Sequence, residues 1–330
     1  MRCDNGRCIH TMYKCNNIDD CGDGTDEAKC NKVESHKGQC GRPTKPVINK
    51  FNRNNDAMWK ILRESTSSDE DYNKLVAQLG IFDPVTLKLA GGNVANTNSF
   101  PWHALINVIT DGVEKVCSGA LIERNWIVTA AHCLVTFDSI EVVLGENDRI
   151  IPDRTEQKFL ADKVILHPEY RRDDVDHVHD LGLIKLTDLA SMNDAVSAVC
   201  LNDILPEKDD ICILTGFGYT EDQNNNSIKL RQGQMTLVGH DECQAQWGNF
   251  TISKNAICAG AFNEPSACKG DSGGPLACLS SNGNWFLRGV TSWGSNICKS
   301  EGSKPTVFTA ISYYADWIKT QIDNSISCTG

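Results

Sequence analysis

Sixteen cysteines in 330 residues restrict the fold of this chain more than any other feature of its sequence. Intracellular proteins rarely carry so many cysteines unless they bind metal ions. Most of the spacings here differ from the repeated C-x-x-C pairs of zinc sites. We therefore expect disulfide bonds and an extracellular location. The start, Met1-Arg2-Cys3, shows no charged-then-apolar leader, so we expect the natural chain to begin upstream.

The net charge of the chain indicates which classes of partner are not expected. The formal net charge is −11, and no run rich in lysine and arginine offsets it. Nucleic acid and anionic membrane surfaces attract basic proteins, so neither is expected as the main partner. No apolar stretch approaches the roughly 18 residues that indicate a transmembrane helix, so we expect no membrane span.

Residues 1–30 form a short, acidic segment that holds five cysteines. Thirty residues cannot bury an adequate apolar core, so disulfides must stabilise such a segment. Its carboxylates cluster at residues 20–27 and would repel one another unless a hard cation lay among them. Oxygen ligands at short spacing suit calcium.

The sequence Cys21-Gly22-Asp23-Gly24-Thr25-Asp26-Glu27 resembles the end of a low-density lipoprotein receptor class A repeat. The resemblance implies a ligand-binding module for protein or glycan, with structural calcium held by side chains of Asn16, Asp20, Asp26 and Glu27 and carbonyls of Tyr13 and Ile18. Asn16 stands where the family has aspartate, which weakens the site. The family's first cysteine is absent. The implied pairs are Cys3–Cys21 and Cys15–Cys30, leaving Cys8 alone. The alternative is a disordered or misfolded stub.

Residues 31–88 read as a connector. The segment begins with Gly and Pro among basic residues and continues through a polar, acidic stretch at residues 64–71. Such composition is exposed and accessible to proteases. Cys40 is the one residue expected to attach it to another domain.

Residues 89–330 predict an all-β domain. β-branched and aromatic residues recur between Gly, Asn, Asp and Pro punctuation, as in a series of short strands. The expected strands are Trp102–Ile109, Trp126–Ala131, Ile140–Leu144, Leu181–Leu186, Cys212–Gly216, Gln232–Val238, Phe286–Trp293 and Thr306–Ala310. A single helix is expected at the end of the chain, where Ile311, Trp317, Ile318 and Ile322 share one face.

Three motifs in this domain carry chemistry. His132 follows an apolar strand in Thr129-Ala130-Ala131-His132-Cys133, and Asp180 opens an apolar run. Each of these alone fits a structural role, and a buried carboxylate needs strong hydrogen bonds. His177 and His179, just before Asp180, are expected to be solvated loop residues. The third motif surrounds Ser272 with glycines, which permit a tight turn that exposes the hydroxyl and directs N–H groups at one point.

In the order His, Asp, Ser, these motifs resemble those of the chymotrypsin-like serine proteases across residues 89–330. The resemblance implies two packed six-stranded β-barrels with the active site between them and no cofactor for catalysis. It implies that Ser272 attacks the peptide carbonyl, that His132 transfers the proton and that Asp180 orients His132. The N–H groups of Gly270 and Ser272 would form the oxyanion hole. The rival interpretation is a non-catalytic adhesion or cofactor protein with the same fold.

The same resemblance implies a set of disulfides. They are Cys117–Cys133, Cys212–Cys278, Cys243–Cys258, Cys268–Cys298 and Cys40–Cys200. The last would keep the connector attached after a cut, whereas Cys328 has no usual partner in the family.

The family resemblance also implies a zymogen. A cut between Lys88 and Leu89 would free an amino group that inserts beside the nucleophile, pairs with Asp271 and orders the oxyanion hole. The family usually has Ile-Val where this chain has Leu89-Ala90.

By alignment on the serine motif, Ser266 forms the floor of the primary specificity pocket. Thr306 narrows it, Gly294 leaves its mouth open, and the stretch Ser292, Trp293, Gly294 pairs with the substrate backbone. An uncharged floor cannot neutralise Lys or Arg, so we expect cleavage after medium apolar residues. The enzyme should then reject Lys88. Activation needs an upstream trypsin-like protease or self-cleavage after Leu87 or Leu89.

The order of modules resembles arthropod haemolymph proteases that act in innate immunity, which implies a protein substrate such as a downstream protease zymogen. Glu146 and Glu156 bracket an acidic loop at the spacing of a trypsin-type calcium loop, although loop carboxylates are commonly just solvated. The triplets beginning at Asn225 and Asn249 are glycosylation acceptors.

Overall fold

The structure is a computed structural model of the chain. It describes residues 2–7, 9, 19, 21–26, 28, 40–43, 92–171, 177–202, 204, 211–220, 223–260, 264–280, 284–295 and 304–325. No helix within these ranges is long and apolar enough to cross a membrane.

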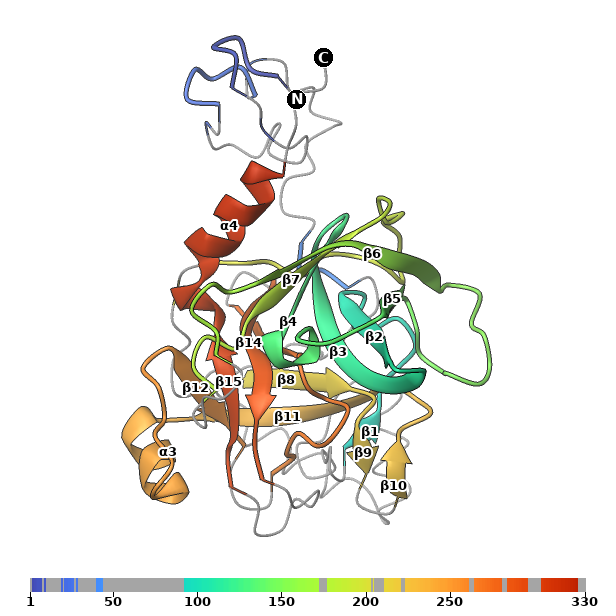
Figure 1. The fold of residues 1–330 in the computed structure, drawn as a ribbon, viewed down its shortest axis with the longest axis vertical. Helices are drawn as coiled ribbons and strands as arrows, with labels where there is room; N and C mark the ends of the chain where they lie inside the picture. The colour runs from blue at the N-terminus through green and yellow to red at the C-terminus, as the bar shows by residue number, and fades with distance from the viewer. Residues whose placement is uncertain are drawn as a thin grey trace, which may run out of the picture.

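Six antiparallel strands close into a first barrel (Figure 1). In spatial order they are β2 (His103–Thr110), β3 (Val113–Glu123), β4 (Trp126–Thr129), β7 (Gly182–Leu186), β6 (Gln157–Leu166) and β5 (Ser139–Leu144). Closure removes the unpaired edges that an open sheet would present. Exposed and half-buried residues alternate over the first six positions of β6, whereas β4 is buried throughout.

A second ring of six strands follows in the sequence. It runs β8 (Ile211–Gly216), β11 (Arg231–Val238), β12 (Ala256–Ala259), β15 (Thr306–Ala310), β14 (Trp285–Trp293) and β13 (Pro275–Leu279). β8 pairs with both β11 and β13, and this double pairing closes the ring. The short strand β1 (Asn93–Val94) adds to β11, and β9 (Tyr219–Thr220) pairs with β10 (Gln223–Asn226). The predicted double six-stranded barrel is confirmed.

The helices lie outside the barrels (Figure 1). The helix α4 (Ala315–Asn324) ends the described chain as predicted, and buries Ile318 and Ile322. Ile311, expected on the same helix, lies instead in a separate 3-10 turn, η4 (Ile311–Tyr313). A second helix, α3 (His240–Trp247), was not predicted. It buries only Cys243 and Trp247, so its apolar face is too narrow to stand out in the sequence.

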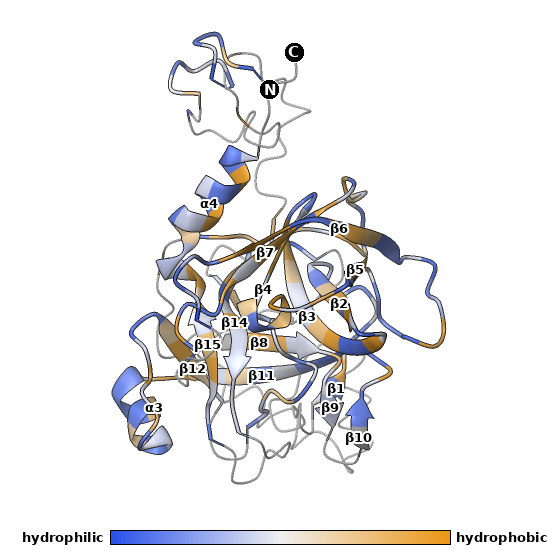
Figure 2. Ribbon diagram, viewed as in Figure 1, coloured by the Kyte–Doolittle hydropathy of each residue, from blue (hydrophilic) through white to orange (hydrophobic). Residues whose placement is uncertain are grey.

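One apolar cluster joins the two barrels. It includes Trp102 and Trp126 of the first barrel, Leu287 of the second and Ile318 of α4. Figure 2 shows hydrophobic residues along the barrel strands and hydrophilic ones on much of α3. Burial of this cluster holds the barrels together, so residues between them are placed by a rigid core.

The described disulfides join the segments that the family resemblance paired. The structure contains Cys3–Cys21 in the first module and Cys40–Cys200 between the connector and the protease domain. It also contains Cys117–Cys133, Cys212–Cys278 and Cys243–Cys258. Cys268 is disulfide-bonded. Its expected partner Cys298, and the expected pair Cys15–Cys30, lie outside the described residues.

Candidate active site

His132 lies in a 3-10 turn, η3 (Ala131–Cys133), that directly follows the buried strand β4. Two contacts with one carboxylate fix its position. Its backbone N–H donates to Asp180 Oδ1 at 2.9 Å, and its Nδ1 lies 2.7 Å from Asp180 Oδ2. The imidazole is 20% exposed, whereas the Asp180 side chain is fully buried. The outer edge of the ring is therefore left open toward solvent while its inner edge is held.

Asp180 precedes β7 and is held by the second barrel as well. Ser292 Oγ of β14 donates to Asp180 Oδ2 at 2.6 Å, and Thr309 Oγ1 of β15 donates to the Asp180 carbonyl at 2.8 Å. Burial alone would raise the pKa of Asp180, but His132 and the hydrogen bonds of His132 and Ser292 hold that pKa below its ordinary value. Asp180 is thus an ionised, oriented acceptor.

Ser272 lies in the loop before β13, against the segment that carries His132. Its carbonyl accepts the Ser118 N–H at 2.8 Å and lies 3.7 Å from Cys133 Sγ. The next residue, Gly273, has φ +78°, and a Cβ there would lie 2.1 Å from Thr129 Oγ1. Only glycine permits this approach. The backbone of the serine loop therefore packs directly on the end of β4.

Among the described residues, the Ser272 hydroxyl makes no hydrogen bond to the imidazole of His132. Catalytic hydrogen bonds of this kind are often long without substrate and tighten when it binds. The N–H groups of Gly270 and Ser272 also donate no hydrogen bond within the described chain. Gly270 has φ +95°, and its carbonyl accepts Ser118 Oγ at 3.3 Å. These two free donors are available to an anion.

Asp271, beside the serine, points away from it into the second barrel. Its carboxylate accepts the N–H of Gly218 at 2.8 Å and that of Cys268 at 2.9 Å. Burial raises the pKa of Asp271 to about 6, which the two N–H donors only partly offset. A Cβ on Gly218 would lie 2.4 Å from the carboxylate, so the pocket is closely fitted to it. Lys88 and Leu89, the expected activation residues, lie outside the described chain.

The predicted specificity residues come together on the other side of the serine loop. Ser266 and Thr306 are buried, and Thr306 Oγ1 accepts the Ala267 N–H at 3.1 Å. A Cβ on Gly294 would lie 3.7 Å from Thr306 Oγ1, so Gly294 and Thr306 face each other across ordinary van der Waals space. The Ser292 hydroxyl is taken by Asp180, which leaves its backbone for a ligand.

Trp293 belongs to an aromatic wall that the sequence did not reveal. Its ring centroid lies 4.7 Å from that of Trp247 on α3 and 5.9 Å from that of Phe250. Trp247 and Phe250 lie 46 and 43 positions before Trp293 in the sequence, so no local motif joins the three residues. The three rings form one aromatic cluster that joins β14 to α3 and the residues after it.

The acidic loop after β5 contains two oxygens suited to a cation. Glu146 Oε1 and Asp153 Oδ2 are buried without a hydrogen-bond partner within the described residues. Burial, and then the charge of Glu156, raises the pKa of Glu146. Glu156 Oε1 accepts the Asp153 N–H at 2.6 Å, which draws the loop closed. Asp148 is neutralised differently, by Lys229 at 3.5 Å.

The first module is described only in part. Asp26 is fully buried, and its Oδ1 accepts the Cys21 N–H at 3.3 Å, close to the Cys3–Cys21 disulfide. The other expected calcium ligands lie outside the described residues: Asn16, Asp20, Glu27, Tyr13 and Ile18.

His177 and His179 lie in a loop before β7, as predicted, but the prediction that they are solvated is wrong. Both are half-buried, and the ring of His177 lies 6.3 Å from that of His132. His179 stacks on His167 instead, with the rings 4.9 Å and 6° apart. Burial, and then the proximity of His179, lowers the pKa of His167. The loops after β6 and before β7 fold against each other, which sequence spacing alone does not show.

Comparison with known proteins decides the family. The family model for trypsin matches residues 89–318, and the model for low-density lipoprotein receptor domain class A matches residues 1–30. The chain belongs to the trypsin family. It is 34% identical to chymotrypsin-C of Bos taurus over 249 residues, which cover 73% of this chain and 92% of the relative. The protein is accordingly a serine endopeptidase, which acts on protein substrates and needs no cofactor for catalysis.

Elastases are similarly related. The chain is 34% identical to chymotrypsin-like elastase family member 1 of Canis lupus familiaris over 244 residues, which cover 71% of the chain and 92% of the relative. It is 33% identical to the Rattus norvegicus protein of the same name over 250 residues, with coverage of 73% and 92%.

Proposed function

We propose that this endopeptidase is a secreted zymogen that cleaves after medium-sized apolar residues through Ser272, His132 and Asp180. The observation that carries the proposal is the double contact of the Asp180 carboxylate with His132, at its N–H and at Nδ1. That contact sets the imidazole with Nδ1 protonated and leaves Nε2 as the base.

The proposed reaction is acyl transfer. The Ser272 hydroxyl attacks the peptide carbonyl carbon while His132 takes its proton, and the same proton then passes to the leaving amine. Water repeats the sequence to hydrolyse the acyl-enzyme. The free N–H groups of Gly270 and Ser272 stabilise the oxyanion, and losing one such donor typically costs about 10²–10³ in rate.

The proposed specificity follows from the chemistry of Ser266 and Thr306. Their hydroxyls cannot neutralise a cation, so Lys and Arg side chains are disfavoured in the pocket. Thr306 fills space opposite Gly294, which favours Leu, Met, Val or Ala over aromatic rings. The resemblance to a chymotrypsin and to elastases supports this preference.

Activation is proposed to run through Asp271. Its buried carboxylate has a raised pKa, so it gains strongly from a nearby ammonium such as the amino group that a cut at Lys88–Leu89 would free. The pocket disfavours Lys88, so the enzyme does not make this cut itself. Activation is performed by an upstream trypsin-like protease, or the enzyme cleaves itself after Leu87 or Leu89. The Cys40–Cys200 bond would then retain the connector.

The remaining expectations concern location and partners. The disulfides support secretion, and Asn225 and Asn249 are exposed and open to glycosylation. Calcium fits the loop between Glu146 and Glu156, because Glu146 Oε1 and Asp153 Oδ2 are buried there with no hydrogen-bond partner among the described residues. Calcium in the class A module and a role in an immune cascade follow from the family resemblance.

A fluorophosphonate label tests the catalytic proposal. The processed enzyme should be labelled at Ser272, and the label should compete with a Leu peptide substrate. Ser272→Ala is the matched control and should take up no label. A processed enzyme that hydrolyses Arg and Leu substrates equally would contradict the specificity, and one that resists the label would contradict the nucleophile.

A further inference from the structure

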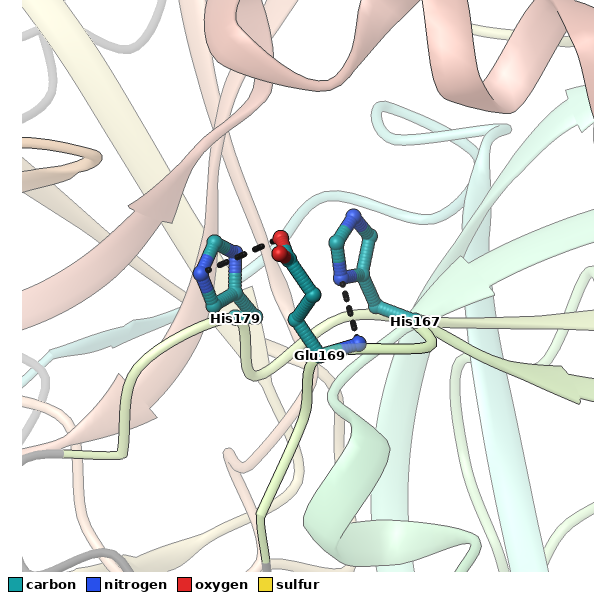
Figure 3. Close-up of side chains that lie close together, drawn as sticks. All are labelled: His167, Glu169 and His179. Carbon is teal, nitrogen blue, oxygen red and sulfur yellow. Dashed lines mark hydrogen bonds and ion pairs between the residues drawn. The ribbon is translucent and has the colours of Figure 1, made fainter.

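Figure 3 shows a cluster of two imidazoles and one carboxylate on the loops that follow β6 and precede β7. His167, Glu169 and His179 each offer one ligand atom, and these atoms all lie within 4.8 Å of one another. His179 Nε2 is 3.6 Å from Glu169 Oε2. We propose that His167, Glu169 and His179 bind a zinc ion.

The fold itself assembles the cluster. The strand ladder between β6 and β7 continues by one hydrogen bond beyond the strands, from His167 N–H to the Leu181 carbonyl at 2.9 Å. The residues after β6 therefore lie beside the residues before β7. Both segments leave a rigid barrel, so the site is supported by strands on each side.

The donor set selects the ion. Two imidazole nitrogens disfavour calcium and magnesium, which take oxygen ligands, and favour zinc or a similar divalent transition metal. Zinc with three protein ligands keeps a fourth position for water. Tetrahedral zinc at about 2.1 Å from each ligand sets neighbouring ligands about 3.4 Å apart, close to the observed His179–Glu169 separation.

One ring must turn before both histidines can ligate the same ion, because they are stacked almost parallel. His167 is confined, with the rings of Tyr314 and Trp317 at 5.1 and 4.9 Å. His179 is the freer residue, with a side chain 26% exposed, and Glu169 is 70% exposed. We therefore propose that the side chains of His179 and Glu169 move when zinc binds, while the ring of His167 stays in place.

Tyr314 supplies the outer contact that metal-bound histidines usually have. Its hydroxyl lies 3.0 Å from His179 Nδ1. Asn255 Nδ2 lies 3.3 Å from the same Nδ1 atom. Zinc binding through Nε2 requires Nδ1 to carry the proton and donate it to the Tyr314 hydroxyl, and loss of such a contact typically weakens metal binding about 10–100-fold.

The site adjoins Asp180, the carboxylate that is proposed to orient His132. His179 immediately precedes Asp180, and its carbonyl accepts the Leu181 N–H at 2.7 Å, so the two residues form a tight turn around Asp180. A metal that draws His179 toward His167 strains this turn. On the proposed function, zinc should slow hydrolysis by displacing Asp180 from His132.

Calorimetric titration with zinc chloride tests binding. The full chain with Ser272→Ala is titrated in saturating calcium, which fills the carboxylate sites. We expect one zinc site that His167→Asn abolishes, that Glu169→Gln weakens at least tenfold, and that Tyr314→Phe weakens about 10–100-fold. His240→Asn, an exposed histidine on α3, is the matched control. A cobalt titration should give the visible spectrum of a tetrahedral complex in the parent and not in His167→Asn.

The outcomes distinguish zinc binding from the effect of zinc on hydrolysis. Zinc affinity that survives both His167→Asn and Glu169→Gln, with melting temperatures unchanged in chelator, would overturn the site. A site lost only in His177→Asn would assign the metal to His132 and His177 instead. In the active enzyme, zinc should lower kcat/KM in the parent and leave His167→Asn unaffected. Equal inhibition of both would overturn the link to Asp180, while labelling of Ser272 tests the proposed function separately.

Discussion

Ser292 of the second barrel donates its hydroxyl hydrogen, at 2.6 Å, to the buried carboxylate of Asp180, which precedes strand β7 of the first barrel. The same strand, β14, is proposed to pair with the substrate backbone. The strand that holds the Asp180 carboxylate is therefore also the strand proposed to bind the substrate. A substitution at Ser292 should therefore lower kcat more than it changes KM.

Replacing Ser292 with alanine should lower kcat about tenfold and change KM little. One hydrogen bond to a charged group is worth about 1.5–3 kcal/mol, of which only part reaches the transition state. Steady-state kinetics on a Leu substrate measures it. Thr309→Val is the control, because it removes a contact to the Asp180 carbonyl and leaves the carboxylate intact. Asp180→Asn should cost about 10⁴ in kcat. Full activity in Ser292→Ala would contradict the coupling.

A comparison of Asp180 with the residues that contact it shows which parts of the site could be predicted from the sequence. Local motifs drew attention to His132, Asp180 and Ser272, and the resemblance to the chymotrypsin-like serine proteases assigned their roles. The contact of Ser292 with Asp180 spans 112 positions and leaves no local pattern. The stacking of His167 on His179 is hidden for the same reason, since it depends on two loops that fold together.

The fold was predictable in type and less so in detail. Thr306–Ala310 was predicted with its observed ends, whereas the run from Trp126 stops at Thr129 because the chain turns into η3. Of the strands that form the two barrels, β3, β6, β12 and β13 were not predicted. Three of the four exposed positions of β6 are charged (Lys158, Asp162 and Lys163), and β13 begins at a proline just after the glycine-rich loop.

Asp271 should make the uncut chain less stable as pH rises. Burial raises its pKa to about 6 from an ordinary value of 3.8. Between those values Asp271 holds more protons in the folded chain than in the unfolded chain, so its contribution to stability is most favourable below about pH 4 and is reduced by roughly 3 kcal/mol as pH rises through 6. With Ser272→Ala as parent, the gain in melting temperature from Asp271→Asn should grow between pH 4 and pH 7. A gain that does not vary with pH would contradict this origin.

The specificity pocket should respond to the size of residue 306. Thr306→Gly should raise kcat/KM for Phe substrates relative to Val substrates by about tenfold. The substitution removes the Thr306 side chain and enlarges the proposed pocket by the volume of two or more methylene groups. Ser266→Asp should instead raise hydrolysis after Arg, since a carboxylate would then face the cation. A panel of peptide substrates on the processed enzyme measures both. Unchanged ratios in both variants would show that these residues do not line the pocket.

The Cys40–Cys200 disulfide should hold the processed protein together. A cut after Lys88 leaves a front segment of 88 residues and a protease domain of 242, from 330 − 88. These should run as one band on a non-reducing gel and as two after reduction. Cys40→Ser should release the front segment without reduction. Release from the parent under non-reducing conditions would show that the bond does not form in the mature protein.

Gly273 should prove essential to the position of the nucleophile. A Cβ there would meet Thr129 Oγ1 at 2.1 Å and the Ser118 carbonyl at 2.4 Å, and the φ of +78° disfavours any side chain. Gly273→Ala must therefore push the serine loop away from the end of β4, where His132 begins. We expect labelling of Ser272 by fluorophosphonate to fall at least 100-fold, because displacements of about 1 Å cost this much.

Gly239→Ala is the matched control for that change. Gly239 precedes α3 with φ −57°, and a Cβ there meets nothing within 4 Å. It should leave the labelling rate and the melting temperature unchanged. Circular dichroism separates displacement from unfolding in Gly273→Ala, since a folded protein with slow labelling is the expected result. A Gly273→Ala enzyme that is folded and labels at the parent's rate would show that the serine is not positioned by this packing.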